Sequence, residues 1–397
     1  TNTFNTAVGY FAGQQVTTGQ YNTILGGDAG DALTTGNSNV AIGYFALSTE
    51  DAHGLNVAVG SRALGNQNAG TDAYNVAVGA DAGLSVTTGV QNVLLGGLAG
   101  DALTDADANV ALGYAALSSD TLGSKSIAVG TGALFTQNFT TATNAYNVAV
   151  GDSAGNAVTT GVQNILIGGL AGDAITTGNS NVSVGHGSLS LNTASHRNTA
   201  IGEFALSALN ITTSTNAYNT ALGYSAGAGV TTGTQNTLIG GLTGDALTTG
   251  ALNVAVGYGA LTSDDLGSKS VALGHSTLAN QNYATATDSF NTAIGHSAGS
   301  AVTTGVQNTL IGAEAGDAMT DAILNVAVGY QALSGETSGR KSIGIGYGAL
   351  LAQNITTNSD VLNVAIGHFA GGSVTTGIYN VLIGGLAGDA ITDADFN

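Results

Sequence analysis

A five-residue unit recurs along the whole chain and constrains its fold more than any other feature. The unit is Asn, Val or Thr, a usually small residue, an aliphatic residue and Gly, as in NTAVG from Asn5 and NVAIG from Asn363. There are 22 complete copies, most of them about 17 residues apart. One such unit cannot bury a core alone, but stacked copies can, so the repeat predicts a solenoid.

A longer period lies above the short one. Three intervals of about 17 residues are followed by one of about 21 residues, which is shortened to 19 in the first block. Four copies therefore form a block of about 72 residues. The blocks start at Asn5, Asn75, Asn147, Asn219, Asn291 and Asn363. Because the pattern has no break, we expect residues 1–397 to form a single continuous solenoid. Both ends are cut in register, which leads us to expect a piece of a longer chain.

The fifth position of the unit is Gly in all 22 copies. An unvarying Gly after a short β-branched segment indicates a strand closed by a turn that needs positive φ or has no room for a Cβ. A helix is excluded, because each Gly would cost it about 1 kcal/mol. The predicted fold is therefore all-β, a parallel β-solenoid (β-roll) of 22 short coils. The expected turn residues of the first coils are Gly9, Gly26, Gly43, Gly60, Gly79 and Gly96.

The composition argues against several classes of function. The 25 Asp and Glu outnumber six Lys and Arg, giving a net charge of −19. A nucleic-acid partner is therefore not expected, since it requires a basic face, and neither is contact with a membrane. The chain has no Cys, which excludes disulfides and thiolate metal sites. We expect no cofactor, and the sequence leaves open whether a metal ion is bound.

Several repeats resemble those of known fibrous proteins. SVALG at Ser270 to Gly274 and SIAVG at Ser126 to Gly130 resemble the head repeats of YadA-like trimeric autotransporter adhesins. NTALGYSAGAGVTTGTQN from Asn219 to Asn236 is similar to repetitive tail-fibre proteins of bacteriophages. This resemblance covers essentially the whole chain and implies three identical chains side by side in a surface-exposed adhesive fibre. The coils are longer than those of the adhesin heads, and the four-coil block is a second departure from that pattern.

Charged residues recur in register with the blocks. An Asp occupies the same place in every second coil, and a basic residue directly precedes most fourth coils. The basic residues fit a charge pair between coils or chains as well as they fit a solvated surface. For the Asp residues, a turn that bonds its own backbone is favoured over a Ca²⁺ or Mg²⁺ site. The candidates for these charge pairs are Lys125, Arg197, Lys269, Lys341, Asp101, Asp173, Asp245 and Asp317.

Aromatic residues form two sets. The first directly follows the invariant Gly, and packing or surface exposure is favoured there over a ladder that binds sugar or metal. Its members are Tyr10, Tyr44, Tyr114, Tyr224, Tyr258, Tyr330 and Tyr347, with His186, His275, His296 and His368 in other coils. The second set closes each block, and we expect it to pack the long loop of the fourth coil. It comprises Phe4, Tyr74, Tyr146, Tyr218, Phe290 and Leu362.

The same loop carries three N-x-T sequons, at Asn138, Asn210 and Asn354. They are candidate glycosylation sites if the protein passes through a glycosylating secretory route.

The sequence predicts a structural role and no catalysis, since it holds neither a nucleophile motif nor an acidic pair outside the repeat pattern. We expect the shaft of a viral tail fibre or cell-surface adhesin, extracellular and homotrimeric. Such a shaft would reach a host receptor or glycan through a tip outside this segment. The alternative is an extracellular filament assembled by end-to-end stacking of solenoids. An ice-binding array is disfavoured because the recurring Thr pair is lost in many coils, and a glycan depolymerase lacks its carboxylate pair.

Overall fold

The computed structural model describes residues 3–397, and these residues contain strands and turns but no helix. They form a parallel β-solenoid of about 22 turns with a period of about 17 residues, which confirms the predicted fold class. We number positions within a coil from the repeat Asn as position 1, so each main strand covers positions 2 to 4.

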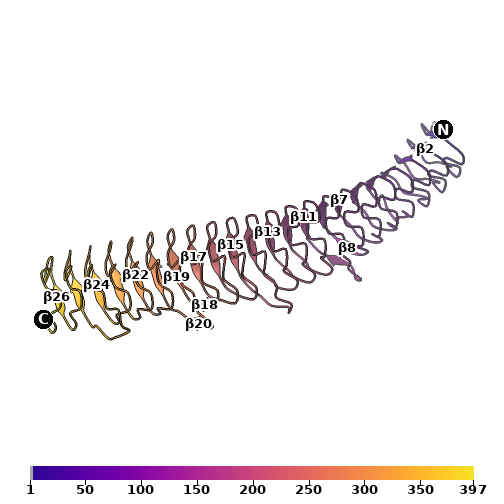
Figure 1. Cartoon of the computed structure of the whole chain (residues 1–397). Helices are drawn as coiled ribbons and strands as arrows, with labels where there is room; N and C mark the ends of the chain where they lie inside the picture. Colours follow the sequence, from indigo (N-terminus) through magenta and orange to yellow (C-terminus); the bar gives the residue numbers. More distant parts are fainter. Residues whose placement is uncertain (1–2) are drawn as a thin grey trace. The chain divides into compact units, whose positions relative to one another are not determined.

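Two compact units make up the chain. One runs up to Arg197 and includes Thr212–Asn216, and the other comprises Asn198–Ile211 and Ala217–Asn397. Within each unit the main strands stack one upon another (Figure 1). The main strands of the first unit are β1 (Thr6–Val8), β2 (Thr23–Leu25), β3 (Val40–Ile42), β4 (Val57–Val59), β5 (Val76–Val78), β6 (Val93–Leu95), β7 (Val110–Leu112), β9 (Ile127–Val129), β11 (Val148–Val150), β12 (Ile165–Ile167) and β13 (Val182–Val184). Those of the second are β14 (Thr199–Ile201), β15 (Thr220–Leu222), β16 (Thr237–Ile239), β17 (Val254–Val256), β19 (Val271–Leu273), β21 (Thr292–Ile294), β22 (Thr309–Ile311), β23 (Val326–Val328), β24 (Ile343–Ile345), β25 (Val364–Ile366) and β26 (Val381–Ile383).

The strands pair in parallel and in one register. Val148 of β11 faces Ile165 of β12, so that like positions of successive coils lie together. The backbone N–H of Val148 donates to Asn164 O at 2.8 Å, and that of Gly168 donates to Val150 O at 2.7 Å. A three-residue strand is too short to hold a register alone, so the register is carried by contacts that recur in every coil.

The invariant Gly at position 5 closes each strand in a backbone conformation that suits Gly. Its φ lies between +124° and +142° along the chain, and Gly9, Gly26, Gly43, Gly60, Gly79 and Gly96 all fall within this range. A Cβ on Gly26 would lie 2.5 Å from the carbonyl oxygen of Gly43 in the next coil. Both the backbone angle and the close stacking therefore exclude larger residues at this position.

The core is filled in two different ways, and this explains the four-coil period. In first and second coils, position 9 is Gly and position 12 is an apolar residue, buried in all but the two terminal coils, as with Gly30 and Leu33. In third and fourth coils, position 9 is a buried Leu and position 12 is polar in nearly every block, as with Leu47 and Glu50. A Cβ on Gly30 would lie 2.9 Å from Leu33 Cδ1, so the two arrangements exclude each other within one coil.

The longer loop of the fourth coil is filled by residues that the sequence reasoning missed. In two blocks it adds a short strand pair, β8 (Gly123–Ser124) with β10 (Thr143–Asn144) and β18 (Gly267–Ser268) with β20 (Thr287–Asp288). The side chains buried beneath these loops are Phe139, Ile211, Tyr283 and Ile355. The expectation that the block-closing set fills this space is wrong, because Phe4, Tyr74, Tyr146, Tyr218, Phe290 and Leu362 are exposed. Their backbone is in the left-handed region, and their side chains lie on the surface of the coils.

Candidate functional site

The described residues enclose no pocket or cleft. Nor do these residues include any helix that could cross a membrane. The candidate functional features are surfaces and the polar clusters within the core.

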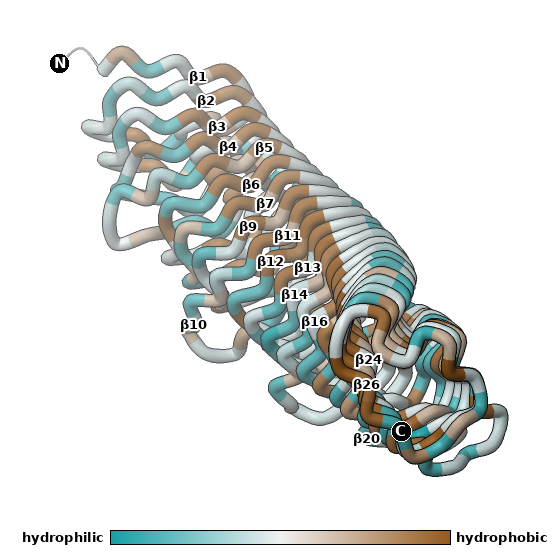
Figure 2. The backbone as a smooth tube through the Cα atoms, turned by 90° about the vertical axis from the view of Figure 1, so that its left-hand side faces the viewer, coloured by the Kyte–Doolittle hydropathy of each residue, from teal (hydrophilic) through white to brown (hydrophobic). Residues whose placement is uncertain are grey.

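An apolar stripe, which we define as positions 2 and 4 of the main strands, runs along the outside of each unit. Position 3 is buried in every main strand except β1, whereas positions 2 and 4 are half-buried or exposed. Leu112 is 42% exposed and Ile167 is 39% exposed, although each is flanked by the equivalent residues of the coils on either side. The strands form continuous hydrophobic bands in each unit (Figure 2). All members of the stripe are Val, Ile, Leu or Thr, so it carries no charge.

Rings at position 6 form short stacks on the surface. Tyr258, His275 and His296 come from three successive coils, with ring centroids 5.6 Å and then 5.4 Å apart. A second stack, one block later, consists of Tyr330, Tyr347 and His368. Each ring covers the face of its neighbour, so these faces are not open platforms for a sugar ring.

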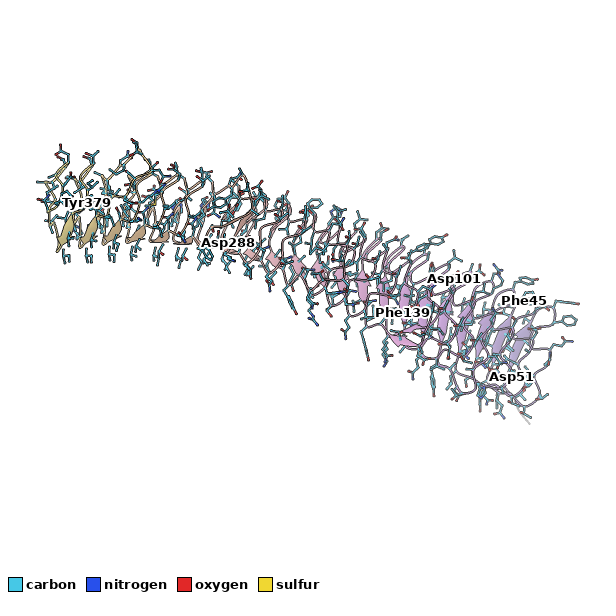
Figure 3. The ribbon with its side chains drawn as sticks, turned by 90° about the horizontal axis from the view of Figure 1, so that it is seen from below. Phe45, Asp51, Asp101, Phe139, Asp288 and Tyr379 are labelled. Carbon is cyan, nitrogen blue, oxygen red and sulfur yellow. The ribbon has the colours of Figure 1, made fainter. Side chains whose placement is uncertain are left out.

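The recurring lysines make contacts between successive coils. Lys269 Nζ lies 2.6 Å from Asp288 Oδ2 (Figure 3), and Lys341 Nζ lies 2.7 Å from Asp360 Oδ2. Lys125 Nζ instead lies 3.4 Å from the hydroxyl of Tyr146. Arg197 occupies the equivalent position, where its backbone N–H donates to Asn179 O at 3.1 Å. The acidic partners of Lys269 and Lys341 thus come from the fourth-coil loop.

The Asp series at position 10 of the second coils lies elsewhere and is half-buried. One carboxylate oxygen is buried without a hydrogen bond in Asp31, Asp101, Asp173 and Asp317. Burial raises the pKa of these four carboxyl groups, and their own backbone N–H groups partly offset that shift. Asp245 differs, because the hydroxyl of Thr262 in the next coil donates to its Oδ1 at 2.5 Å. The series has the local backbone bonds of a turn, and the described residues place none of it in a three-ligand cluster.

The repeat Asn forms an internal ladder that sequence reasoning did not anticipate. In Asn236, Nδ2 donates to Gly250 O at 2.9 Å, which ties together the two ends of one coil. Its Oδ1 accepts the backbone N–H of Asn253 at 3.0 Å, which ties that coil to the next. Asn22, Asn92, Asn164 and Asn308 make the same pair of bonds. The signal was the near-invariance of Asn at a position that faces the core.

A buried acid and a buried Gln at position 12 face each other across the third and fourth coils. In the fourth block, Gln281 Nε2 donates to Asp264 Oδ2 at 2.7 Å and to Ser270 Oγ at 2.8 Å. Gln281 Oε1 accepts from Asn291 Nδ2 at 2.9 Å, so the chain of bonds continues into the Asn ladder. The second and fifth blocks repeat it with Asp120 and Gln137 and with Glu336 and Gln353. Ser replaces the repeat Asn in these three fourth coils, and its hydroxyl accepts a bond from Gln.

The third block shows that acid and Gln change together. Asn192 stands in the place of the acid, and Leu209 stands in the place of the Gln. Asn192 Oδ1 accepts from the hydroxyl of Ser195 at 2.6 Å, within its own coil. Burial raises the pKa of Asp264 to about 6, against the lowering effect of its bonds from Gln281 and Gly267. Ionising the buried acid thus costs free energy. The third block, which lacks the acid, also lacks the Gln that bonds it in the second, fourth and fifth blocks.

The first block differs again and contains the one group of three potential metal ligands among the described residues. Glu50, Asp51 and His53 each offer a ligand atom, and these atoms lie within 4.8 Å of one another. Glu50 is fully buried and Asp51 lies at the surface (Figure 3). The sequence analysis named none of these residues; a signal was available, because His53 stands where three other blocks have Gly.

The three sequon residues are exposed. Asn138 and Asn354 each accept a hydrogen bond from a Thr hydroxyl of the preceding coil, at 3.1 Å from Thr121 and 2.8 Å from Thr337. Asn210 has a backbone bond to Thr231 O at 2.9 Å. All three residues therefore lie at the surface.

No protein-family model matches this sequence, and no curated protein matches it.

Proposed function

We propose that this chain is the shaft of a structural or adhesive fibre in which three copies pack side by side along their apolar stripes. The proposal is carried by the stripe itself. In each unit, eleven successive strands display two apolar or Thr side chains outward, and at about 4.8 Å per strand such a band extends for about 50 Å. An exposed apolar surface of that length marks an interaction site.

The geometry of the stripe favours another copy of the same chain as its occupant. The stripe is uncharged and periodic at the spacing of the coils, and a second stripe has the same period and the same lack of charge. The absence of a pocket among the described residues argues against a small-molecule role and supports a mechanical one. In such a fibre, stacked hydrogen-bonded coils give length and stiffness. A tip outside this segment would bind the host receptor or glycan, and the fibre would be displayed extracellularly on a virion or cell.

Charged residues placed in the stripe test this proposal. We expect Leu112→Lys combined with Ile167→Lys to convert a three-chain particle into single chains in sedimentation velocity, because buried unpaired charges oppose association. The matched control is Thr88→Lys, an exposed position away from the stripe, which should keep three chains together. Assembly that is unaffected by the stripe variant would contradict the proposal.

A further inference from the structure

The first block holds a polar cluster that the other blocks lack. At position 15 of the third coil, His53 replaces the Gly123, Gly267 and Gly339 of three other blocks. A Cβ on Gly339 would lie 2.6 Å from Glu336 Oε2, so a side chain at this position displaces the neighbouring acid. His53 therefore places an imidazole beside a buried carboxylate at a position that holds Gly in three other blocks and Ser195 in the third.

Three buried polar atoms in the third and fourth coils of this block make no hydrogen bond. They are His53 Nδ1, Asn56 Nδ2 and Gln67 Nε2. Asn56 and Gln67 are both fully buried, and His53 Nδ1 lies 3.7 Å from Glu50 Oε1, beyond hydrogen-bonding distance. Buried polar atoms are paired in nearly all native proteins, so the unpaired imidazole nitrogen of His53 indicates a missing partner, whereas the two amide NH2 groups are donors that need an acceptor.

The register directs Gln67 toward Glu50. Gln67 lies 17 residues after Glu50, the separation at which Gln137 reaches Asp120 at 2.6 Å. The same separation brings Gln353 to within 2.7 Å of Glu336. In the first block the carboxylate is instead held by the backbone N–H groups of His53 at 3.1 Å and Ala69 at 3.3 Å. By this register, the unpaired Nε2 of Gln67 faces the coil that carries Glu50.

We propose that Glu50, Asp51 and His53 form a site for a divalent transition-metal ion such as Zn²⁺. One imidazole nitrogen and two carboxylate oxygens form a donor set suited to Zn²⁺, whereas Ca²⁺ takes oxygen ligands alone. Ligand atoms on one Zn²⁺ lie about 3.3–3.6 Å apart, close to the separation of His53 Nδ1 and Glu50 Oε1. Asp51 is exposed and closes the remaining gap by rotating its side chain.

Binding of Zn²⁺ to the intact chain tests the site directly. We expect one saturable equivalent per chain in competition with a chromophoric chelator, and a visible absorption band of low-coordinate Co²⁺ at the same stoichiometry. His53→Gly, which installs the residue of three other blocks, should weaken Zn²⁺ binding at least about tenfold. Asp51→Thr, which copies Thr121 and Thr337, should weaken it as well.

Two controls separate this site from general attraction of cations to an acidic chain. Asp105→Asn removes an exposed carboxylate outside the cluster and should leave the affinity unchanged. Cooperative melting in the presence of EDTA shows that each variant is folded. If His53→Gly does not fold, the Zn²⁺ affinity of Asp51→Thr is the test of the site. Absence of saturable binding to the intact chain overturns the proposal, as does binding that survives the deciding variant.

Discussion

The third and fourth coils have the same backbone arrangement in the first and fourth blocks. The two blocks differ in how the buried polar side chains of these coils are hydrogen-bonded. In the fourth block, Gly267 leaves room for the Asp264 carboxylate, which bonds Gln281 and so joins the Asn ladder. In the first block, His53 takes that room, and Gln67 bonds Asn75 but not the acid. The two blocks also differ at the first residue of the fourth coil, where Asn56 replaces Ser270, so a few substitutions separate a closed hydrogen-bond network from an open cluster.

The largest effect is expected from transferring the His of the first block into the fourth. In Gly267→His, the new Cβ would collide with the Asp264 carboxylate and displace it from Gln281. Because a buried carboxylate and a buried amide then lose their partners, the free energy of unfolding should fall by about 3–5 kcal/mol. Urea denaturation measures this, with the exposed substitution Thr304→His as control. Equal stability of the two variants would refute our account of the polar core.

A smaller effect is expected from the titration of Asp264. Burial raises its pKa to about 6 from an ordinary value of 3.8, so the folded state binds a proton more tightly than the unfolded chain. The contribution of this group to stability is therefore greatest below about pH 4 and is lost as the pH rises through 6, by at most about 3 kcal/mol. Unfolding free energies at pH 4 and pH 7 should differ less in Asp264→Asn than in the unaltered chain. An identical pH dependence would show that Asp264 does not titrate in this range.

The reverse transfer should be mildly stabilising in the absence of metal. His53→Gly removes the Cβ beside Glu50, so the carboxylate can reach Gln67 as its counterparts do in other blocks. One restored buried bond, less the backbone entropy of Gly, should raise the free energy of unfolding by about 1 kcal/mol. Thermal melting in EDTA measures the change. A loss of stability in EDTA would mean that His53 itself stabilises the coil.

The smallest effect is expected for the surface ion pairs. Lys269→Met removes both the contact with Asp288 and the ammonium that lies over the Phe290 ring. Exposed pairs of this kind contribute about 0–1 kcal/mol, and salt screens them. The unfolding free energy should therefore change by less than about 1 kcal/mol, and the change should vanish at high salt, about 1 M NaCl. A larger loss that persists in salt would assign these lysines a structural role.

Much of the fold was predictable because it follows from spacing and residue type alone. The constant short period, the invariant Gly and the short β-branched segments together require stacked parallel strands. The sequence showed that the apolar residue stands at position 12 in some coils, as with Leu33, and at position 9 in others, as with Leu47. The reason is that the two side chains fill the same volume of the core in different coils. That reason emerges only from the packing.

The candidate site was less predictable, because it depends on which residues of different coils meet. The sequence suggested that Lys269 pairs with a carboxylate. The repeat pattern did not reveal whether that carboxylate is Asp288 in the fourth-coil loop or one of the recurring Asp residues of the second coils. Similarly, Glu50 and Gln67 look like two unrelated polar residues until the register brings them together. The left-handed backbone of large residues such as Tyr146 and Lys269 also has no local sequence signal. Their N–H groups, or those of adjacent residues, are paired between coils, and such pairing offsets the local strain.

The central claim is that the apolar stripe is an interface between copies of this chain, and the mass of the particle in solution tests it most directly. Multi-angle light scattering over a wide range of concentrations should give three times the chain mass of 38.7 kDa, constant throughout the range. A mass of one chain would contradict the claim, because the stripe would then remain exposed to water. A mass that grows steadily with concentration would also contradict it and favour end-to-end filaments.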